Sequence, residues 1–267
     1  MSFKVFLGPA GSPGFTKGGT LEGISNVAEI GLNSMEVEFT YGVKMGRDLA
    51  KKCGEVAKEK GIRLSCHAPY YVNLCNEKKV EDSMRRILTA ADRMSLMGGG
   101  VVVFHPGFYG DLGEDVAFEL VEHACARLAE KAPEGVFLGL ETTGKHSQFG
   151  NLDETVRICK SVKGCVPVVD FAHLYARAGG KIDYGKVLDA VKTLKLDVLH
   201  SHFSNIEFSD KGEKKHLIVE DNPPFEPLAR EVLKTKTSIN VICESPILEQ
   251  DSLKMKKVFE ELGHDFK

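Results

Sequence analysis

The sequence predicts an α/β protein folded as a (β/α)8 barrel, and two observations carry this prediction. Eight short apolar runs alternate with segments of helical periodicity along the 267 residues. Six successive runs, from the third onward, end in histidine, aspartate or glutamate. Residues from six successive strands can meet at one point only if the strands surround a common axis, which disfavours the competing doubly wound open sheet.

The strand-like runs are rich in branched and apolar residues. They begin near Phe3, Ser34, Arg63, Val101, Phe137, Val166, Val198 and Asn240. The first helical segment has Thr20 as its expected N-cap and Gly31 as its expected end. Further helical stripes are expected over 84–94, 116–128, around 156, over 187–194 and over 228–233.

The remaining segments carry no sign of a second folding unit. No linker rich in glycine or proline divides the chain, so residues 1–267 are expected to form a single domain with its site at the carboxyl ends of the strands. The polar connection from Asn205 to Phe225 is expected to cover the mouth of the barrel.

Composition excludes several classes of function. The net charge of -3 argues against bulk, charge-driven binding of nucleic acid, although a local basic rim can still hold phosphate. No apolar run is long enough for a signal peptide or a membrane span, and the seven cysteines include no CxxC pair. We therefore expect a reduced, cytoplasmic protein. A match to the phosphate-binding loop at 180–186 is followed by Val187 instead of Ser or Thr, so no nucleotide cofactor is expected.

The strand ends supply a candidate metal centre. Its imidazoles are His67, His105 and His202, with His200 on the same strand face as an open alternative to His202. Glu141 follows the run Val-Phe-Leu-Gly-Leu, where an unpaired carboxylate would be strongly desolvated, and Glu244 repeats this pattern.

Asp170 and His173 add two ligand types where a strand turns into a loop. One zinc ion needs about four ligands, and at least seven candidates are present. We therefore expect two or three ions, zinc in preference to manganese, with bridging carboxylates. Clustered divalent ions suit hydrolysis of a phosphate ester, because they generate hydroxide, neutralise the phosphate and hold the leaving oxygen.

These residues resemble the endonuclease IV family of apurinic/apyrimidinic (AP) endonucleases. The resemblance runs over most of the chain from His67 to Glu244. Its pieces are the HxxYxxNL pattern from His67 to Leu74, the FHPG motif from Phe104 to Gly107, the Glu141-Thr-Thr-Gly loop, the Asp170-Phe-Ala-His173 turn, His202 with the polar loop after it, and the Glu244 strand.

The resemblance implies a zinc-dependent DNA-repair nuclease that hydrolyses the phosphodiester 5′ to an abasic site. It implies that His67 and His105 hold a first ion and that Glu141 bridges to a second, completed by Asp170, His202 and Glu244. His173 would hold a third ion together with an acid and a histidine from the polar loop. Tyr70 matches a residue that contacts DNA. The partner would be DNA containing abasic sites, and a monomer is expected.

The chain departs from the family pattern in two loops. Alignment places Glu213 on the family aspartate and Lys215 on the family histidine, with His216 able to substitute if the loop bends differently. The loop after the second strand offers only Lys44 and Arg47 as cations for DNA.

Two alternatives stay open at this stage. One is a sugar isomerase or epimerase of the related xylose-isomerase-like barrels, which uses one ion and a pair of glutamates. The other is a nucleic-acid-binding barrel without catalysis.

Overall fold

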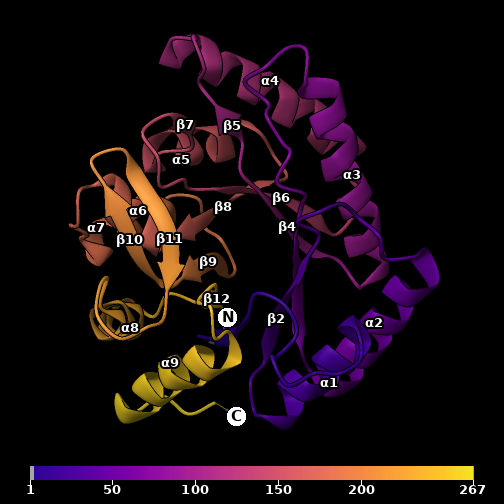
Figure 1. Ribbon diagram of the computed structural model, residues 1–267, viewed down its shortest axis with the longest axis vertical. Coiled ribbons are helices and arrows are strands. Elements are labelled where there is room, and N and C mark those ends of the chain that lie inside the picture. The colour runs from indigo at the N-terminus through magenta and orange to yellow at the C-terminus, as the bar shows by residue number, and fades with distance from the viewer. Residues whose placement is uncertain (1–2, 267) are drawn as a thin grey trace.

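The computed structural model describes residues 3–266 and shows eight parallel strands ringed by helices (Figure 1). The order of strands around the sheet is β1-β12-β9-β8-β6-β4-β3-β2. The strands are β1 (Val5–Pro9), β2 (Ser34–Glu38), β3 (Arg63–His67), β4 (Gly100–Phe104), β6 (Val136–Glu141), β8 (Cys165–Asp170), β9 (Leu199–Phe203) and β12 (Ile239–Cys243). The predicted (β/α)8 fold is confirmed.

The ring closes where β1 meets β2. The backbone N–H of Gly11 donates to the carbonyl of Glu36 at 2.9 Å, and a bridge joins Ala10 to Glu36. A Cβ atom at Gly8 would lie only 1.5 Å from the carbonyl oxygen of Ser34. Glycine at this position therefore permits the close approach of the two backbones that completes the barrel.

Nine helices lie within the described residues. They are α1 (Thr20–Glu29), α2 (Arg47–Lys60), α3 (Val80–Leu96), α4 (Glu114–Lys131), α5 (Leu152–Ser161), α6 (Phe171–Arg177), α7 (Tyr184–Lys192), α8 (Phe225–Thr235) and α9 (Glu249–Glu261). Thr20 is the first helical residue and the cap is Gly19, so the cap prediction was wrong. Gly31 adopts φ +78° just beyond α1, as expected for a helix end. No helix among residues 3–266 is long and apolar enough to cross a membrane.

Strand alternation sorts side chains between the helices and the barrel interior. Outward residues such as Met35, Cys66 and Phe104 are buried in the main core. The side chains inside the barrel form two clusters. One part is an interior apolar cluster made of Val101, Val103, Val166 and Val168. The other is an interior polar cluster made of Glu36, Ser65, His200 and Asn240, all fully or almost fully buried.

Two small two-stranded sheets lie outside the barrel. Strands β5 (Gly107–Phe108) and β7 (Gln148–Phe149) pair with each other, as do β10 (Asn205–Ser209) and β11 (Gly212–Leu217). The connection from Asn205 to Phe225, expected to cover the mouth of the barrel, is partly a β-hairpin, drawn in orange beside α6 (Figure 1). Ile206 packs on Ala172 and Ala176 of α6, which fixes the hairpin against the barrel.

Candidate metal centre

Glu141, the last residue of β6, lies at the centre of the candidate site. Its side chain is fully buried. One carboxylate oxygen, Oε2, lies 3.1 Å from Nε2 of His67 and 2.8 Å from Nε2 of His105. The other oxygen, Oε1, lies 3.4 Å from Nδ1 of His173 and 3.2 Å from Nδ1 of His202. The two oxygens thus face two separate pairs of imidazoles.

The residues around Glu141 fall into two overlapping groups. Ligand atoms of His67, His105 and Glu141 all lie within 4.8 Å of one another. The same spacing holds for the group of Glu141, Asp170, His202 and Glu244. Glu141 belongs to both groups, so the structure brings together the residues expected for the first and second ions.

Backbone carbonyls fix the orientation of two imidazoles. Nδ1 of His67 lies 2.8 Å from the carbonyl oxygen of Ala68, and Nδ1 of His173 lies 2.9 Å from that of Thr142. A carbonyl can only accept a hydrogen bond, so each Nδ1 carries the proton. Nε2 of each ring, which faces a carboxylate, is therefore the nitrogen available to bind a metal ion.

A β-bulge explains how the hairpin reaches the site. Glu207 pairs with Lys215, but the next pair is Phe208 with Glu213, which leaves Lys214 as an extra residue in β11. The bulge places Glu213 and His216 on the same face of the strand, although simple alternation would put Glu213 with Lys215. Lys215 is exposed and pairs with Glu207.

The two inward residues of the hairpin lie next to His173. Oε2 of Glu213 lies 2.9 Å from Nε2 of His173. The His216 ring lies 5.3 Å from the His173 ring, between centroids, and its Nε2 is 3.8 Å from Oε2 of Glu244. The structure therefore brings His173, Glu213 and His216 together, with His216 in the place that the alignment gave to Lys215.

Burial and neighbouring charges shift the pKa values of the ionisable groups in the centre. Burial opposes charge on His202, but Glu244, Glu36 and Glu141 outweigh burial and raise the pKa of the ring well above its usual value. Burial opposes ionisation of Glu213, but His173 outweighs it and lowers the pKa of this carboxyl to about 2. Burial lowers the pKa of His216, which favours the neutral ring that can bind a metal.

Several buried polar atoms of the centre make no hydrogen bond. They include Oδ2 of Asp170, Nε2 of His173 and Oε2 of Glu213. Buried polar atoms are rarely left without a partner unless a group such as a metal ion satisfies them. Imidazole and carboxylate donors suit zinc and other first-row divalent ions, so the residues present fit a cluster of such ions.

A cavity of about 290 Å³ opens from this cluster to the surface. Tyr70 lies at its edge, 58% exposed, with its ring 5.7 Å from that of His67. Lys145 lines the cavity and its Nζ lies 3.6 Å from Oε1 of Glu213. Lys44 is exposed before α2, whereas Arg47 is held in an ion pair with Asp92. Among the proposed DNA contacts, Tyr70 is therefore the one that the structure places at the cavity.

Sequence reasoning missed three residues at or below the centre. Glu36 and Glu38 lie on the interior face of β2, and Lys145 follows the Glu141 loop. Oε1 of Glu36 lies 3.0 Å from Nε2 of His202. The alternation Ser34-Met-Glu36-Val-Glu38 carries the signal for this face, because apolar and polar residues swap at every step. His200, left open as an alternative ligand, faces Glu36 and not Glu141.

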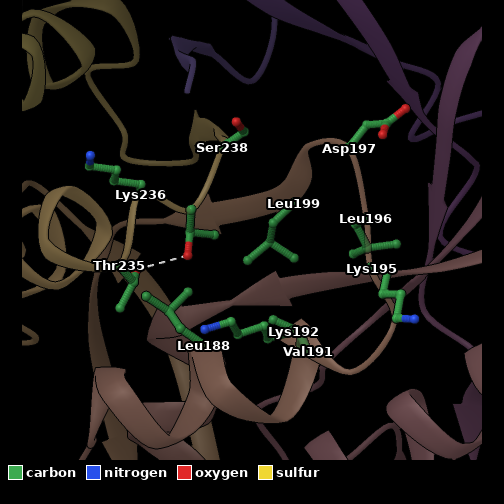
Figure 2. A pocket seen from close by; sticks show the side chains of 11 residues that line it. Leu188, Val191, Lys192, Lys195, Leu196, Asp197, Leu199, Thr235, Lys236 and Ser238 are labelled. Atoms are coloured by element: carbon green, nitrogen blue, oxygen red, sulfur yellow. Dashed lines mark hydrogen bonds between the residues drawn. The ribbon is translucent and has the colours of Figure 1, made fainter. Parts of the chain in front are cut away.

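A second cavity, of about 220 Å³, lies at the opposite ends of β9 and β12 (Figure 2). Its wall combines aliphatic side chains such as Leu188 with Lys192, Lys195 and Lys236. It contains no imidazole, so its chemistry differs from that of the barrel mouth.

Similar proteins place the chain in a family. An uncharacterized protein of Methanocaldococcus jannaschii is 35% identical over 272 residues, which cover 97% of this chain and 98% of the relative. A protein named probable endonuclease 4 from Mycoplasma mobile is 27% identical over 204 residues, covering 72% of each chain. The crystal structure of a D-tagatose 3-epimerase-like protein superposes with a TM-score of 0.71 at 18% identity, covering 91% of this chain and 94% of that one, which shows a shared fold. Residues 24–262 match the xylose isomerase-like TIM barrel family, and the chain belongs to that family.

Proposed function

We propose that this protein is a zinc-dependent phosphodiesterase that hydrolyses DNA at the 5′ side of abasic sites. The observation that carries the proposal is the position of Glu141, whose two oxygens face different pairs of imidazoles. A carboxylate placed in this way can bridge two ions, and a bridged cluster suits phosphate ester hydrolysis better than sugar chemistry. The similarity to a probable endonuclease 4 supports the same activity.

The residues divide into three sets of proposed ligands. We assign them as His67, His105 and Glu141 for one ion, Glu141, Asp170, His202 and Glu244 for a second, and His173, Glu213 and His216 for a third. When bound, clustered zinc ions supply Lewis-acid activation of water and offset the charge of a phosphate ester.

The remaining residues of the mouth would bind the DNA. The aromatic ring of Tyr70 is exposed beside His67, where it can stack on a base or fill the gap of a missing one. Lys145 lies beside the third set of ligands and can contact a phosphate. Lys44 and Arg47 are proposed as further cations of this rim. A local rim of this kind is compatible with the net charge of -3.

The proposal is tested by incision of a duplex that contains one abasic site, with and without a chelator, alongside elemental analysis. We expect two or three equivalents of zinc, and cleavage that the chelator stops. Glu141→Gln should reduce cleavage by at least about 100-fold, because it removes the bridging charge. Lys192→Ala, in the cavity at the other end of the barrel, is the matched control and should cleave normally. A zinc-loaded protein that leaves the duplex intact would overturn the nuclease proposal.

A sugar isomerase or epimerase is the second candidate. The observation that favours it is the compact set of Glu141, Asp170, His202 and Glu244, which could hold a single ion alone. This reading leaves His67, His105 and His173 without a role, although all three face Glu141. One equivalent of manganese or magnesium, with interconversion of ketose epimers, would favour it over the nuclease.

A further inference from the structure

The ring of His202 is enclosed between carboxylates on its two sides. Its Nδ1 lies 3.2 Å from Oε1 of Glu141 and 3.3 Å from Oε1 of Glu244, on the side of the metal centre. Its Nε2 lies 3.0 Å from Oε1 of Glu36, on the side of the barrel interior. A ring that offers a lone pair from Nδ1 to a metal must carry its proton on Nε2. That proton needs an acceptor, since the ring is fully buried.

One carboxylate oxygen of Glu36 accepts two hydrogen bonds, and the other accepts none. Its Oε2 accepts from the hydroxyl of Ser65 at 2.6 Å and from Nε2 of His200 at 3.0 Å. His200 is itself oriented, because its Nδ1 accepts from the side-chain amide of Asn240 at 3.1 Å. Oε1 of Glu36 and Nε2 of His202 are both buried without a hydrogen bond, and they lie 3.0 Å apart, so each is the available partner of the other.

Two other imidazoles of the centre use backbone carbonyls, not a carboxylate, to accept the proton of the nitrogen that does not face the metal site. His67 and His173 place their second nitrogen against the backbone carbonyls of Ala68 and Thr142. His202 sits inside the barrel, where the carbonyls of the neighbouring strands are used in the sheet, and it faces a side chain instead. The contact from β2 to β9 also crosses the interior, because these strands are not neighbours in the sheet.

We propose that Glu36 is a positioning residue of the metal centre, which accepts the Nε2 proton of His202 and thereby directs Nδ1 to the metal. Ser65 and Asn240, the latter through His200, hold Glu36 in place for this role. The proposal rests on the metal centre of the proposed function but not on its substrate. Partners of this kind commonly change the metal affinity of a site by about 10- to 100-fold.

The test measures zinc affinity and stoichiometry of the full chain by competition with a chelator of known affinity. Glu36→Gln keeps the shape of the side chain but leaves one acceptor oxygen for two imidazoles and a hydroxyl, so one ring loses its acceptor. We expect the same number of zinc ions at saturation, with at least one bound about 10- to 100-fold more weakly. Ser201→Ala is the matched control, because Ser201 is buried on β9 between the two histidines and donates to the carbonyl of Asn240.

Each other outcome has a defined meaning. Equal zinc affinity in Glu36→Gln and the unchanged chain would overturn the positioning role. Loss of one whole ion at saturating zinc would also overturn it, because Glu36 would then be a ligand of an inner site with His200 and His202. An unchanged chain that binds no zinc would overturn both this role and the proposed function. Normal zinc binding, a weakened Glu36→Gln and no DNA cleavage would overturn the nuclease alone.

A second measurement covers the case in which Glu36→Gln does not fold. Nitrogen-15 NMR of histidine-labelled, zinc-loaded protein reports which ring nitrogen carries the proton, and His202→Asn assigns the signal. We expect the proton of His202 on Nε2. A proton on Nδ1, or metal at Nε2, would overturn the proposal.

Discussion

The interior apolar cluster and the interior polar cluster lie in the same barrel, but their buried side chains are stabilised in different ways. Val101, Val103 and Val168 fill space with branched side chains that need no partners. Glu36, Ser65, His200 and Asn240 fill it with groups that each require a specific hydrogen bond. The polar cluster reaches the metal centre through Glu36, whose Oε1 lies 3.0 Å from Nε2 of His202.

This difference shows which part of the interior is adapted to the site. A barrel needs only packed apolar layers for stability, and buried charge is costly unless it is paired. Burial opposes ionisation of Glu36, but His202 and His200 outweigh it and hold the pKa of the carboxyl well below its usual range. Glu36 therefore stays ionised within the polar cluster, which fits a role in orienting a ligand above it.

The largest effect is expected from converting the polar cluster into an apolar one. Glu36→Leu leaves two buried imidazoles without their carboxylate, which should lower the free energy of unfolding of the metal-free protein by about 3–5 kcal/mol. Val168→Ala, in the apolar cluster, should cost about 2 kcal/mol through lost methyl groups. Urea denaturation of both variants checks the difference. A Glu36→Leu protein more stable than the unchanged chain would show that the polar cluster is retained against stability.

The next largest effect is expected from the protonation of Glu38, which lies near Glu36 of the polar cluster on β2. Burial raises the pKa of Glu38 to about 7, above the ordinary value of 4.5 that applies to the unfolded chain. The folded state then holds the proton more tightly, so this contribution is fully present below pH 4.5 and is lost as the pH rises through 7. In the metal-free protein the loss should be on the order of 3 kcal/mol.

Glu38→Gln supplies the control for this pH dependence. Glutamine does not titrate, so the fall in unfolding free energy between pH 4.5 and 7 should be smaller in the variant. Burial opposes charge on His67, but Glu141 outweighs it and raises the pKa of the ring to about 10, so its contribution is lost only at higher pH. Identical pH profiles for the two proteins would contradict the assignment to Glu38.

An intermediate effect is expected from crowding the apolar cluster. A Cβ atom at Gly139 would lie 2.5 Å from Cγ1 of Val101 and 2.8 Å from Cγ2 of Val168. Gly139→Ala should therefore lower the free energy of unfolding by about 1–3 kcal/mol. Adding Val101→Ala should restore part of the loss, because it removes one of the methyl groups in conflict. Failure of the double variant to recover any stability would mean that the two sites are not coupled through this contact.

Most of the barrel and much of the centre can be predicted from the sequence, because each depends on local pattern. The strand ends at His67, Glu141 and Asp170 follow from apolar runs that stop at a polar residue. Convergence of these residues follows from barrel closure and needs no further information.

The parts that could not be predicted depend on register and on contacts across the interior. The bulge at Lys214 decides that His216 and not Lys215 faces His173, and no short pattern in the sequence marks it. The pairing of Glu36 with His200 joins residues 164 positions apart. Alternation can place each of them inside the barrel, but not opposite one another.

The smallest effect is expected at the edge of the polar cluster. Ser65→Ala removes one of the two hydrogen bonds to Oε2 of Glu36 and leaves the contact with His200. Loss of a single hydrogen bond of this kind should cost about 1–2 kcal/mol, and zinc affinity should fall less than in Glu36→Gln. Ser83→Ala removes a buried hydroxyl that donates to the carbonyl of Lys79 and accepts from the backbone N–H of Asn73, so it should cost at least as much stability without any change in zinc affinity. Equal zinc affinity in the two serine variants would mean that His200 alone suffices to hold Glu36, whereas a drop as large as that of Glu36→Gln would make Ser65 equally necessary.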